Sequence, residues 1–299
     1  HGSTTQAGSA TVLLHPTALS YTQSRAFVLC NTVRGGVNWD QNDHFRYELD
    51  GGGAGIRFRR HTTTGSSTTH YYQLVTADAA TLRVTHLLTS FSTASTSVAL
   101  GSAHAPARTW LLHSFYADSS ADNHERSALA VAHITSATTA GIERNEALGT
   151  MYSSLQAIEW LDNTQVLATG EVRLGGAATS VTNDTGAVFA SLHARGNAFL
   201  SNNAHQMAGY SDQTGTSRAL PKAMIALSLE PAASPTGTVV VRGTRRVTGG
   251  NVRAYYTLMA FETAAGIPTA APTRRPTDAP TTAPTLTPLA TSPPSTAPT

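Results

Sequence analysis

The stretch His44-Phe45-Arg46-Tyr47-Glu48-Leu49-Asp50 alternates polar and apolar side chains, and Ile56-Arg57-Phe58-Arg59 alternates in the same way. A period of two places the apolar side chains of a strand on one face and the polar side chains on the other. The glycines Gly51-Gly52-Gly53 between the two stretches are typical of a hairpin turn or a bulge. The sequence therefore predicts an antiparallel hairpin with one buried face.

The rest of the chain, up to about Phe261, repeats this kind of pattern. Short apolar runs alternate with segments rich in Gly, Ser, Thr, Asn and Asp, and no window shows a sustained helical period with caps. Such a pattern is typical of antiparallel β-sandwiches, including jelly rolls. We therefore predict an all-β fold built from antiparallel, jelly-roll-like sandwich units.

Four features recur in the same order three times along the chain. Each block has an apolar run, a polar loop that ends near a histidine, a Gly-led strand and a closing aromatic strand. The apolar runs are Ala26–Cys30, Trp110–Leu112 and Val188–Ala190; the histidines are His44, His124 and His205; the closing tyrosines are Tyr72, Tyr152 and Tyr256. Similar units in series form a quasi-linear array.

The repeats predict boundaries for three homologous units and a tail. We place unit 1, with an N-terminal extension, at residues 1–80, unit 2 at 81–163 and unit 3 at 164–263. The third unit is longer than the others, which predicts an insertion near 213–236. The remaining residues, 264–299, have a different composition.

Proline occurs at every fourth residue from Pro268 to Pro288, and the segment has no aromatic residue. Such a segment cannot bury a core, and its prolines favour an extended polyproline-type conformation. Stretches rich in Ser, Thr and Pro are also typical of O-glycosylated stalks, although a plain disordered linker has the same composition. The candidate O-glycosylation sites are the threonines that follow the prolines: Thr269, Thr273, Thr277, Thr281 and Thr285.

Composition limits the function classes. Only 13% of the 299 residues are charged and the formal net charge is +2, so the chain lacks the strong positive field that non-specific nucleic-acid binding requires. No apolar run approaches the length of a membrane-spanning helix, which excludes membrane insertion of that kind. The single cysteine, Cys30, excludes intrachain disulfides and Cys-rich zinc sites.

The two ends of the chain suggest secretion. The chain begins at His1 without an initiator Met, and we interpret this as the product of signal-peptide removal. Asn183-Asp184-Thr185 is an N-glycosylation sequon in what reads as a polar turn, so Asn183 is a further glycosylation candidate. We therefore expect a secreted or cell-surface protein that carries covalent glycans.

Several side chains are candidates for metal binding. The Asp/Asn-rich loops that precede the three histidines could hold Ca²⁺, but Asx residues cap turns without an ion. His1 could bind copper through its amine and imidazole, as in secreted copper monooxygenases, although no other motif of that family is present. We expect the three repeated histidines to be structural, and we predict no metal site and no cofactor.

An arginine group and a tryptophan are candidates for binding a carbohydrate. Arg46, Arg57, Arg59 and Arg60 form a basic group in unit 1, which could meet an acidic glycan or simply face solvent. Trp39 lies in a polar loop and is the candidate aromatic platform for a carbohydrate. The chain has none of the hydrolase or phosphate-loop signatures, so we predict that it is not an enzyme.

Arg25–Leu29 and His70–Val75 resemble repeated β-modules of large bacterial surface proteins, and the Thr-X-X-Pro tail resembles that of glycosylated extracellular filament subunits. The resemblance implies a non-enzymatic, sugar-coated protomer of a homopolymer. Open sheet edges give a physical reason for the same expectation, because a neighbour's terminal segment, from 1–20 or 264–299, could complete them. The alternative is a carbohydrate-binding or adhesive module on a Pro/Thr stalk.

Overall fold

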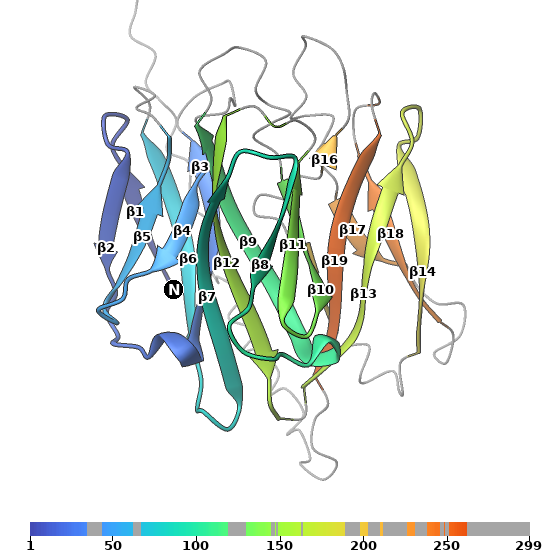
Figure 1. Cartoon of the computed structure of the whole chain (residues 1–299), viewed down its shortest axis with the longest axis horizontal. Coiled ribbons are helices and arrows are strands. Elements are labelled where there is room, and N and C mark those ends of the chain that lie inside the picture. Colours follow the sequence, from blue (N-terminus) through green and yellow to red (C-terminus); the bar gives the residue numbers. More distant parts are fainter. Residues whose placement is uncertain are drawn as a thin grey trace, which may run out of the picture. The chain divides into compact units, whose positions relative to one another are not determined.

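The described chain consists of β-strands joined by turns and short 3₁₀ turns, without an α-helix in the part that the structure describes (Figure 1). The computed structural model describes residues 1–34, 44–61, 67–118, 130–144, 147, 149–162, 164–188, 198–202, 210–211, 226–230, 238–245, 248 and 251–261. Only the backbone is described at 164–167, 186–188, 198–202, 210–211, 238 and 260–261. None of the described segments is a helix long and apolar enough to span a membrane. The predicted all-β fold class is confirmed.

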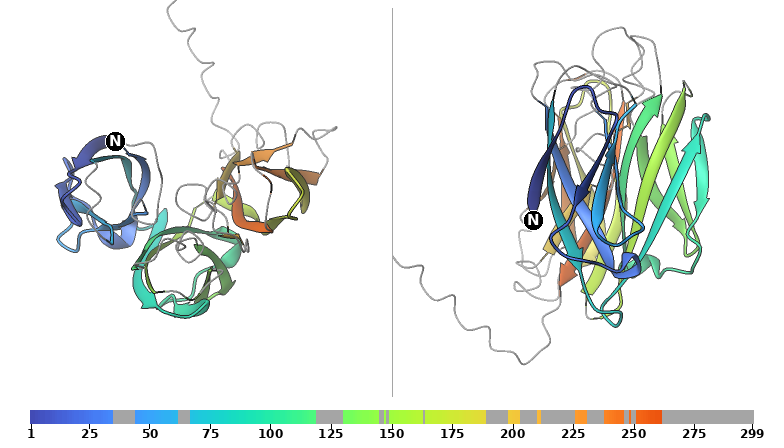
Figure 2. Two further views of the ribbon diagram at one scale, coloured as in Figure 1. Left: turned by 90° about the horizontal axis from the view of Figure 1, so that it is seen from above. Right: turned by 90° about the vertical axis from the view of Figure 1, so that its left-hand side faces the viewer.

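Three successive groups of strands, which we call modules 1, 2 and 3, repeat one arrangement. Module 1 contains β1 (Gly2–Gln6), β2 (Val12–Pro16), β3 (Ala26–Arg34), β4 (Arg46–Leu49), β5 (Gly55–Arg59) and β6 (Thr68–Thr76). Module 2 contains β7 (Leu82–Phe91), β8 (Ser95–Ala99), β9 (Thr109–Asp118), β10 (Ala130–Ser136), β11 (Thr139–Arg144) and β12 (Thr150–Trp160). Module 3 contains β13 (Thr164–Leu174), β14 (Ser180–Val188), β15 (Ala198–Asn202), β16 (Tyr210–Ser211), β17 (Ala226–Leu229), β18 (Thr238–Thr244) and β19 (Val252–Phe261). Seen from above, each module closes around its own interior (Figure 2).

Each module is a sandwich of two antiparallel sheets. In module 1 the sheets have the orders β1-β6-β3 and β2-β5-β4, and modules 2 and 3 repeat both orders, with β16 added beside β19. The third, fourth and fifth strands follow one another around the sandwich and the sixth returns beside the third, which is a Greek-key order. The topology therefore supplies three similar antiparallel sandwiches in series.

The repeated topology adds three details to the sequence interpretation. β1 and β2, at the start of unit 1, are regular strands of module 1. The predicted insertion contains β17, which is the counterpart of β4 and β10 rather than inserted material. The counterpart of β3 and β9 in module 3 is β15, whereas Val188 ends β14. Short apolar runs look alike in a sequence, and only strand pairing distinguishes them.

The glycine cluster forms the turn of the β4–β5 hairpin. The Asp50 N–H donates to the Gly55 carbonyl oxygen over 2.8 Å, and Gly53 has a φ of +73°. A Cβ on Gly53 would lie 2.6 Å from the carbonyl oxygen of Tyr21, so the turn requires glycine there for space as well as for conformation. Ile56 and Phe58 of β5 are fully buried, as the alternation predicts.

Every module has its own apolar core, and a further cluster lies between modules. Phe58 belongs to the core of module 1, Leu155 to that of module 2 and Tyr256 to that of module 3. The further cluster joins Phe27 of module 1 to Trp110, and the two rings meet edge to face at 5.7 Å. Modules 1 and 2 therefore share a buried apolar contact and are not joined by the chain alone.

A buried arginine recurs at the end of the fifth strand of each module. Arg60, Arg144 and Arg245 are 2%, 1% and 5% exposed. Their Nε–H groups donate to the backbone carbonyls of Ala10, Thr93 and Ala178, which lie in the turn between the first and second strands. Arg60 is therefore no part of an exposed basic surface, contrary to its place in the predicted group.

The strand registers also identify equivalent positions. Tyr72 lies opposite Gly2, and Tyr256 lies opposite Gly170; a Cβ on either glycine would be 2.5 Å from the tyrosine oxygen. The 3₁₀ turns Gln23–Arg25 and Pro106–Arg108 precede β3 and β9, so Phe27 corresponds to Trp110 and their partners Val75 and Ile158 correspond as well. Tyr72 lies three residues before Val75 in β6, and Leu155 lies three residues before Ile158 in β12. Leu155 is therefore the counterpart of Tyr72. Tyr152 lies three residues earlier, because equal spacing in the sequence does not mean equal register.

Candidate functional site

Module 2 covers two strand edges that module 1 leaves open. β3 pairs only with β6 and β4 only with β5, so each has one edge without a ladder partner. The Gln156 amide accepts from the Val28 N–H over 2.9 Å and donates to the Val28 carbonyl over 3.0 Å. The Ser114 hydroxyl contacts the N–H and carbonyl of Tyr47 at 3.1 and 3.2 Å. All four residues are buried. Side chains of module 2 thus replace the missing neighbour strands.

A histidine completes this junction. Nε2 of His86 in β7 lies 3.0 and 2.9 Å from the carbonyl oxygens of Gln23 and Ala26. Because both partners are acceptors, Nε2 carries the proton. Burial lowers the pKa of His86, although the two backbone hydrogen bonds act in the opposite direction. His86 therefore serves as a donor that ties both ends of the 3₁₀ turn, at Gln23 and Ala26, to module 2.

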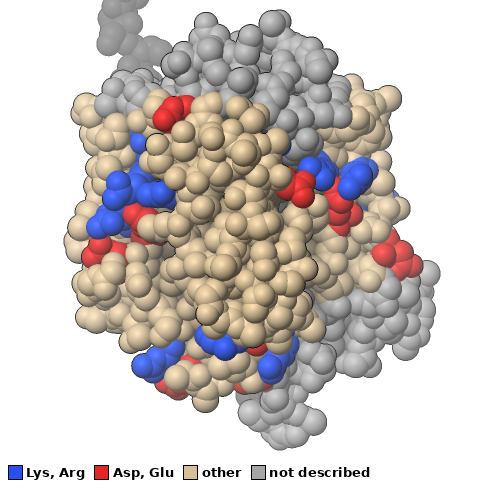
Figure 3. Space-filling model, viewed as in Figure 1, with Lys and Arg blue, Asp and Glu red and all other residues tan. Residues whose placement is uncertain are grey.

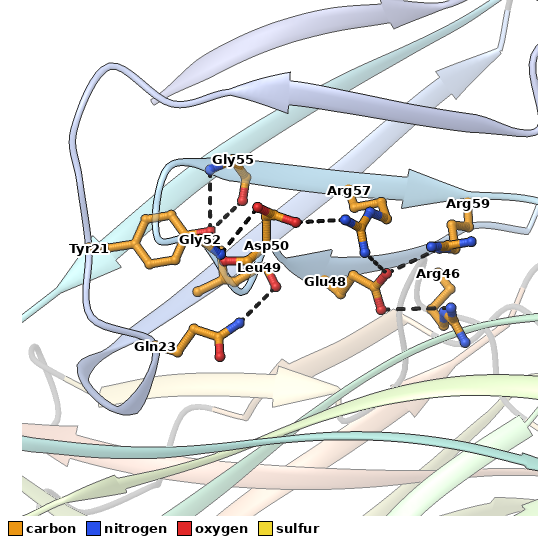
Figure 4. Close-up of polar contacts among 10 residues, drawn as sticks. All are labelled: Tyr21, Gln23, Arg46, Glu48, Leu49, Asp50, Gly52, Gly55, Arg57 and Arg59. Carbon is orange, nitrogen blue, oxygen red and sulfur yellow. Dashed lines mark hydrogen bonds and ion pairs between the residues drawn. The ribbon is translucent and has the colours of Figure 1, made fainter.

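Three arginines of module 1, Arg46, Arg57 and Arg59, are paired with carboxylates (Figure 4). Glu48 lies 3.7 Å from Arg46, 3.4 Å from Arg57 and 3.1 Å from Arg59, and Arg57 also contacts Asp50 at 2.6 Å. An acidic glycan would have to compete with both carboxylates for these guanidinium groups. The face in Figure 3 shows the same mixture, with charges of both signs grouped between broad uncharged areas.

The junction between modules 2 and 3 uses the same elements. The 3₁₀ turn Gln23–Arg25 contacts β7, and the 3₁₀ turn Pro106–Arg108 contacts β13 in the same way. β4 contacts β12, and β10 contacts β19. His133 of β10 stacks on Tyr255 of β19 with ring centres 4.4 Å apart. The two junctions therefore have the same arrangement. The part of one module around its third and fourth strands meets the outer face of the next module's first sheet, which is the sheet that holds that module's first, sixth and third strands.

A cleft of about 280 Å³ lies at the second junction. His86 and Gln156 are cross-strand partners in module 2, and Thr169 and Thr257 are partners at the corresponding positions of module 3. The smaller threonines line the cleft. Its other lining residues are Leu111, His133, Ile134, Gly170, Glu171, Tyr255 and Tyr256. The cleft thus lies where the first junction holds its His–Gln pair.

Charged side chains lie beside the cleft. Arg253 forms an ion pair with Glu143 and lies 3.9 Å from Glu171, which also binds Arg173. Burial is the main cause of the lowered pKa of His133, and the carboxylate of Glu143 partly opposes it. The arrangement offers hydroxyls, a carboxylate and aromatic rings to a small polar molecule.

Module 1 presents the same outer face, and none of the described residues of another module covers it. β1 and β6 place Gly2 opposite Tyr72, so the register continued by one residue places His1 opposite Gln73. These are the counterparts of His86 and Gln156, and both are exposed. Tyr71 and Val33 on this face are 51% and 52% exposed. Their counterparts in module 2 are Ser154, which is buried, and Tyr116, over which the Arg46 guanidinium lies.

The remaining predicted site residues fall in different places. Asn183 lies in β14, not in a turn, and its Nδ2 donates to the Glu171 carbonyl at 3.0 Å and to the Tyr256 hydroxyl at 3.2 Å. A glycan on Nδ2 would displace these bonds. His44 is buried and stacks on Phe115 at 5.6 Å. Outside the described residues lie Trp39, His124, His205 and the tail threonines Thr269, Thr273, Thr277, Thr281 and Thr285.

Sequence reasoning missed the junction residues. Gln156, Ser114 and His86 stand in no recognised motif. The signal that could have found them is the recurrence of a His–Gln pair at the same place in two repeats, His1 with Gln73 and His86 with Gln156, but a correct strand register is needed to see it.

Within the described ranges, no group of three or more His, Cys, Asp or Glu side chains is placed to hold a metal ion. Comparison of the chain with protein-family models, with curated proteins and with solved structures gives no match.

Proposed function

We propose that the protein is a structural subunit that polymerises end to end into a filament, by continuing between chains the junction that joins its own modules. The proposal keeps the expectation of a glycan-coated, extracellular homopolymer. The main support comes from the outer face of module 1. There His1 and Gln73 are exposed, and they hold the positions at which His86 and Gln156 of module 2 form hydrogen bonds to module 1.

The junction has two different halves. One half is the open edge of the third and fourth strands, and the other is the outer face of the sheet that holds the first, sixth and third strands. Module 2 uses both halves, with module 1 on one side and module 3 on the other. Within the described part of the chain, module 1 has an uncovered face, and β15 and β17 of module 3 each have one edge without a ladder partner. The described residues therefore leave one copy of each half unused.

Contact between unlike halves is heterologous. Such a contact leaves a new free half after each addition, so it produces an open helical filament unless the rotation happens to close a ring. The first sheet of module 1 presents mainly hydroxyl, amide and aromatic side chains on its open face, so one chain meets the next without charge repulsion. The backbone groups of β17 at Leu227 and Leu229 would meet this face as those of Tyr47 meet Ser114.

Substitution on the free face tests the proposal. Tyr71→Arg, combined with Gln73→Ala, should abolish filaments in electron micrographs and leave a monomer in sedimentation velocity. The matched control is Ser97→Arg, on an exposed position of β8 outside both junctions. The control should polymerise like the parent chain. A parent chain that stays monomeric at all concentrations, or a double variant that still forms filaments, would refute the assignment.

Saccharide binding is the second candidate function, and the cleft between modules 2 and 3 favours it. Carbohydrate sites combine aromatic surfaces with hydroxyl and carboxylate groups, and the cleft offers Tyr255, Thr257 and Glu171. Glycan-array binding that is lost in Glu171→Gln and retained in Ser97→Arg would support this function. An array without hits for the parent chain would remove it. Trp39, the predicted platform, lies outside the described residues.

A further inference from the structure

Module 1 carries an exposed apolar strip that its sister modules lack. Val12 and Leu14 in β2 are 44% and 51% exposed. Val12 pairs with Arg59, and the corresponding partners in the other modules are Ser95 with Glu143 and Ser180 with Thr244. Leu14 likewise corresponds to Ser97 and Thr182. Two modules thus expose hydroxyls at these positions, and the first exposes a valine and a leucine.

The strip lies on the edge of β2 that has no ladder partner among the described strands. The Arg60 N–H donates to the Thr11 carbonyl, and the Thr17 N–H donates to the Ala54 carbonyl. Backbone groups point to alternate sides along a strand, so those of Thr11 and Thr17 face β5 and those of Val12 and Leu14 face away from it. An apolar edge of this kind is the usual acceptor for an added strand.

The proline spacing of the tail leaves one of its edges intact. The prolines from Pro268 to Pro288 all have even numbers, and Pro293 is the first proline at an odd number. The free tail favours a polyproline-type conformation, but when it pairs as a β-strand its even and odd residues direct their backbone groups to opposite edges. The odd edge therefore keeps every N–H from 267 to 291, and the even edge loses every second one. Proline is tolerated in a strand where its nitrogen faces away from the partner.

We propose that the tail segment 267–291 adds as an edge strand to β2 of the neighbouring chain's module 1 and covers Val12 and Leu14. This inference rests on the proposed end-to-end assembly, which brings the module that carries the tail next to module 1 of the following chain. The tail has 36 residues and spans up to about 120 Å when fully extended. A second copy of β2 is the competing occupant, but the one-sided tail explains both the free edge and the proline spacing.

Trypsin reports on the tail, because it cleaves after Arg274, whereas the bond after Arg275 is blocked by Pro276. In filaments of the parent chain, cleavage after Arg274 should be slowed. The double variant Val12→Ser with Leu14→Ser installs the residues of module 2 and should restore fast cleavage without dissolving the filaments. Leu88→Ser, at an apolar position that is 58% exposed outside the strip, is the matched control and should leave the tail protected.

Two adjacent tail residues, Ala283 and Thr282, test the two edges separately, and neither is a candidate glycosylation site. Ala283→Pro removes an N–H from the odd edge and should speed cleavage about 2- to 10-fold, the effect of one hydrogen bond. Thr282→Pro changes the even edge and should leave the rate unchanged. Equal rates in both variants and in the parent filaments would overturn the tail assignment while leaving the end-to-end assembly intact.

Three further outcomes separate the proposals. If the parent chain forms no filaments, the proposed function fails first. If the tail is already protected in dilute monomer, it docks on its own chain and the assignment to a neighbour is overturned. Cross-linking between copies through β2, with the tail still cleaved rapidly, would instead identify a second β2 strand as the occupant and also overturn the proposal.

Discussion

At the scale of the residue, the molecule depends on polar side chains buried inside an otherwise apolar interior. Arg144 donates to the carbonyls of Thr93 and Gly149, and its guanidinium lies 5.3 Å from the centre of the Phe91 ring. Burial lowers the pKa of this arginine, and the carbonyl partners compensate for the loss of water. The same arginine recurs in all three modules, where it binds the turn between the first and second strands, so this contact is a constant feature of the module.

Replacement of Arg144 should therefore be costly. Arg144→Leu leaves the two carbonyls without donors inside the protein, and each buried unsatisfied group costs about 1–3 kcal/mol. We expect the free energy of unfolding to fall by about 2–5 kcal/mol, measured by urea denaturation. Arg173→Leu, at an arginine whose side chain is 72% exposed, is the control and should lower the free energy of unfolding much less than Arg144→Leu. Equal losses would contradict the role assigned to burial.

Two buried histidines predict how stability depends on pH. Burial lowers the pKa of His70 and of His113 to about 3, in each case as the main cause. An unfolded histidine titrates near its ordinary value of about 6.5, so the unfolded chain takes up protons first as the pH falls. The stabilising contribution is complete above about pH 6.5 and is lost progressively toward pH 3.

The expected loss between pH 6.5 and pH 4 is about 3 kcal/mol for each histidine. Urea midpoints of the parent chain should fall over this range. His113→Cys, which installs the residue that module 1 has at the corresponding position (Cys30), should flatten the dependence. A parent chain with the same urea midpoint at pH 4 and pH 6.5 would contradict the buried, neutral state of both rings.

Among the strands, the edges without a ladder partner have the largest effect on assembly. A sandwich with three strands in each sheet has four edges, and unpaired edges invite uncontrolled association. The chain covers two edges of module 1 with side chains of module 2. Gln156 suits this role because its amide offers one donor and one acceptor in a plane, as a neighbouring backbone does.

Gln156→Ala should destabilise the folded chain by about 2–4 kcal/mol, because both the N–H and the carbonyl of Val28 lose their buried partner. Gln73→Ala is the matched control, since Gln73 occupies the same position on the open face of module 1. The control should change the stability of the monomer by less than about 0.5 kcal/mol. Urea denaturation of dilute, monomeric samples measures both, and similar values for the two variants would contradict the assignment of the junction.

At the scale of the whole molecule, a chain of three similar modules has two unlike ends. One end offers an outer sheet face and the other offers open edges, so growth by the proposed junction is polar. A chain with a blocked face and intact edges would join one filament end and stop further growth there. This behaviour separates a polar, head-to-tail polymer from a symmetric one.

Tyr71→Arg chains, mixed at about one in ten with the parent chain, should therefore shorten filaments without preventing their formation. Filament lengths in electron micrographs give the measurement. Chains that carry Ser97→Arg at the same fraction should leave the length distribution unchanged. Filaments of normal length in the Tyr71→Arg mixture would argue against growth through the free face of module 1.

The sequence by itself determined the all-β class and the succession of similar sandwiches, because alternation with a period of two is a local property that each strand carries alone. It also indicated the buried face of β5, where Ile56 and Phe58 alternate with arginines.

The register of the strands, and with it the junction, depends on contacts between residues far apart in the chain. Which residues of distant strands stand opposite each other depends on loop lengths and packing, so Leu155 rather than Tyr152 matches Tyr72. The burial of Arg60 and the engagement of Asn183 follow from neighbours far away in the chain. The pairing of Gln156 with Val28 joins residues more than a hundred positions apart, and no local pattern records such a contact.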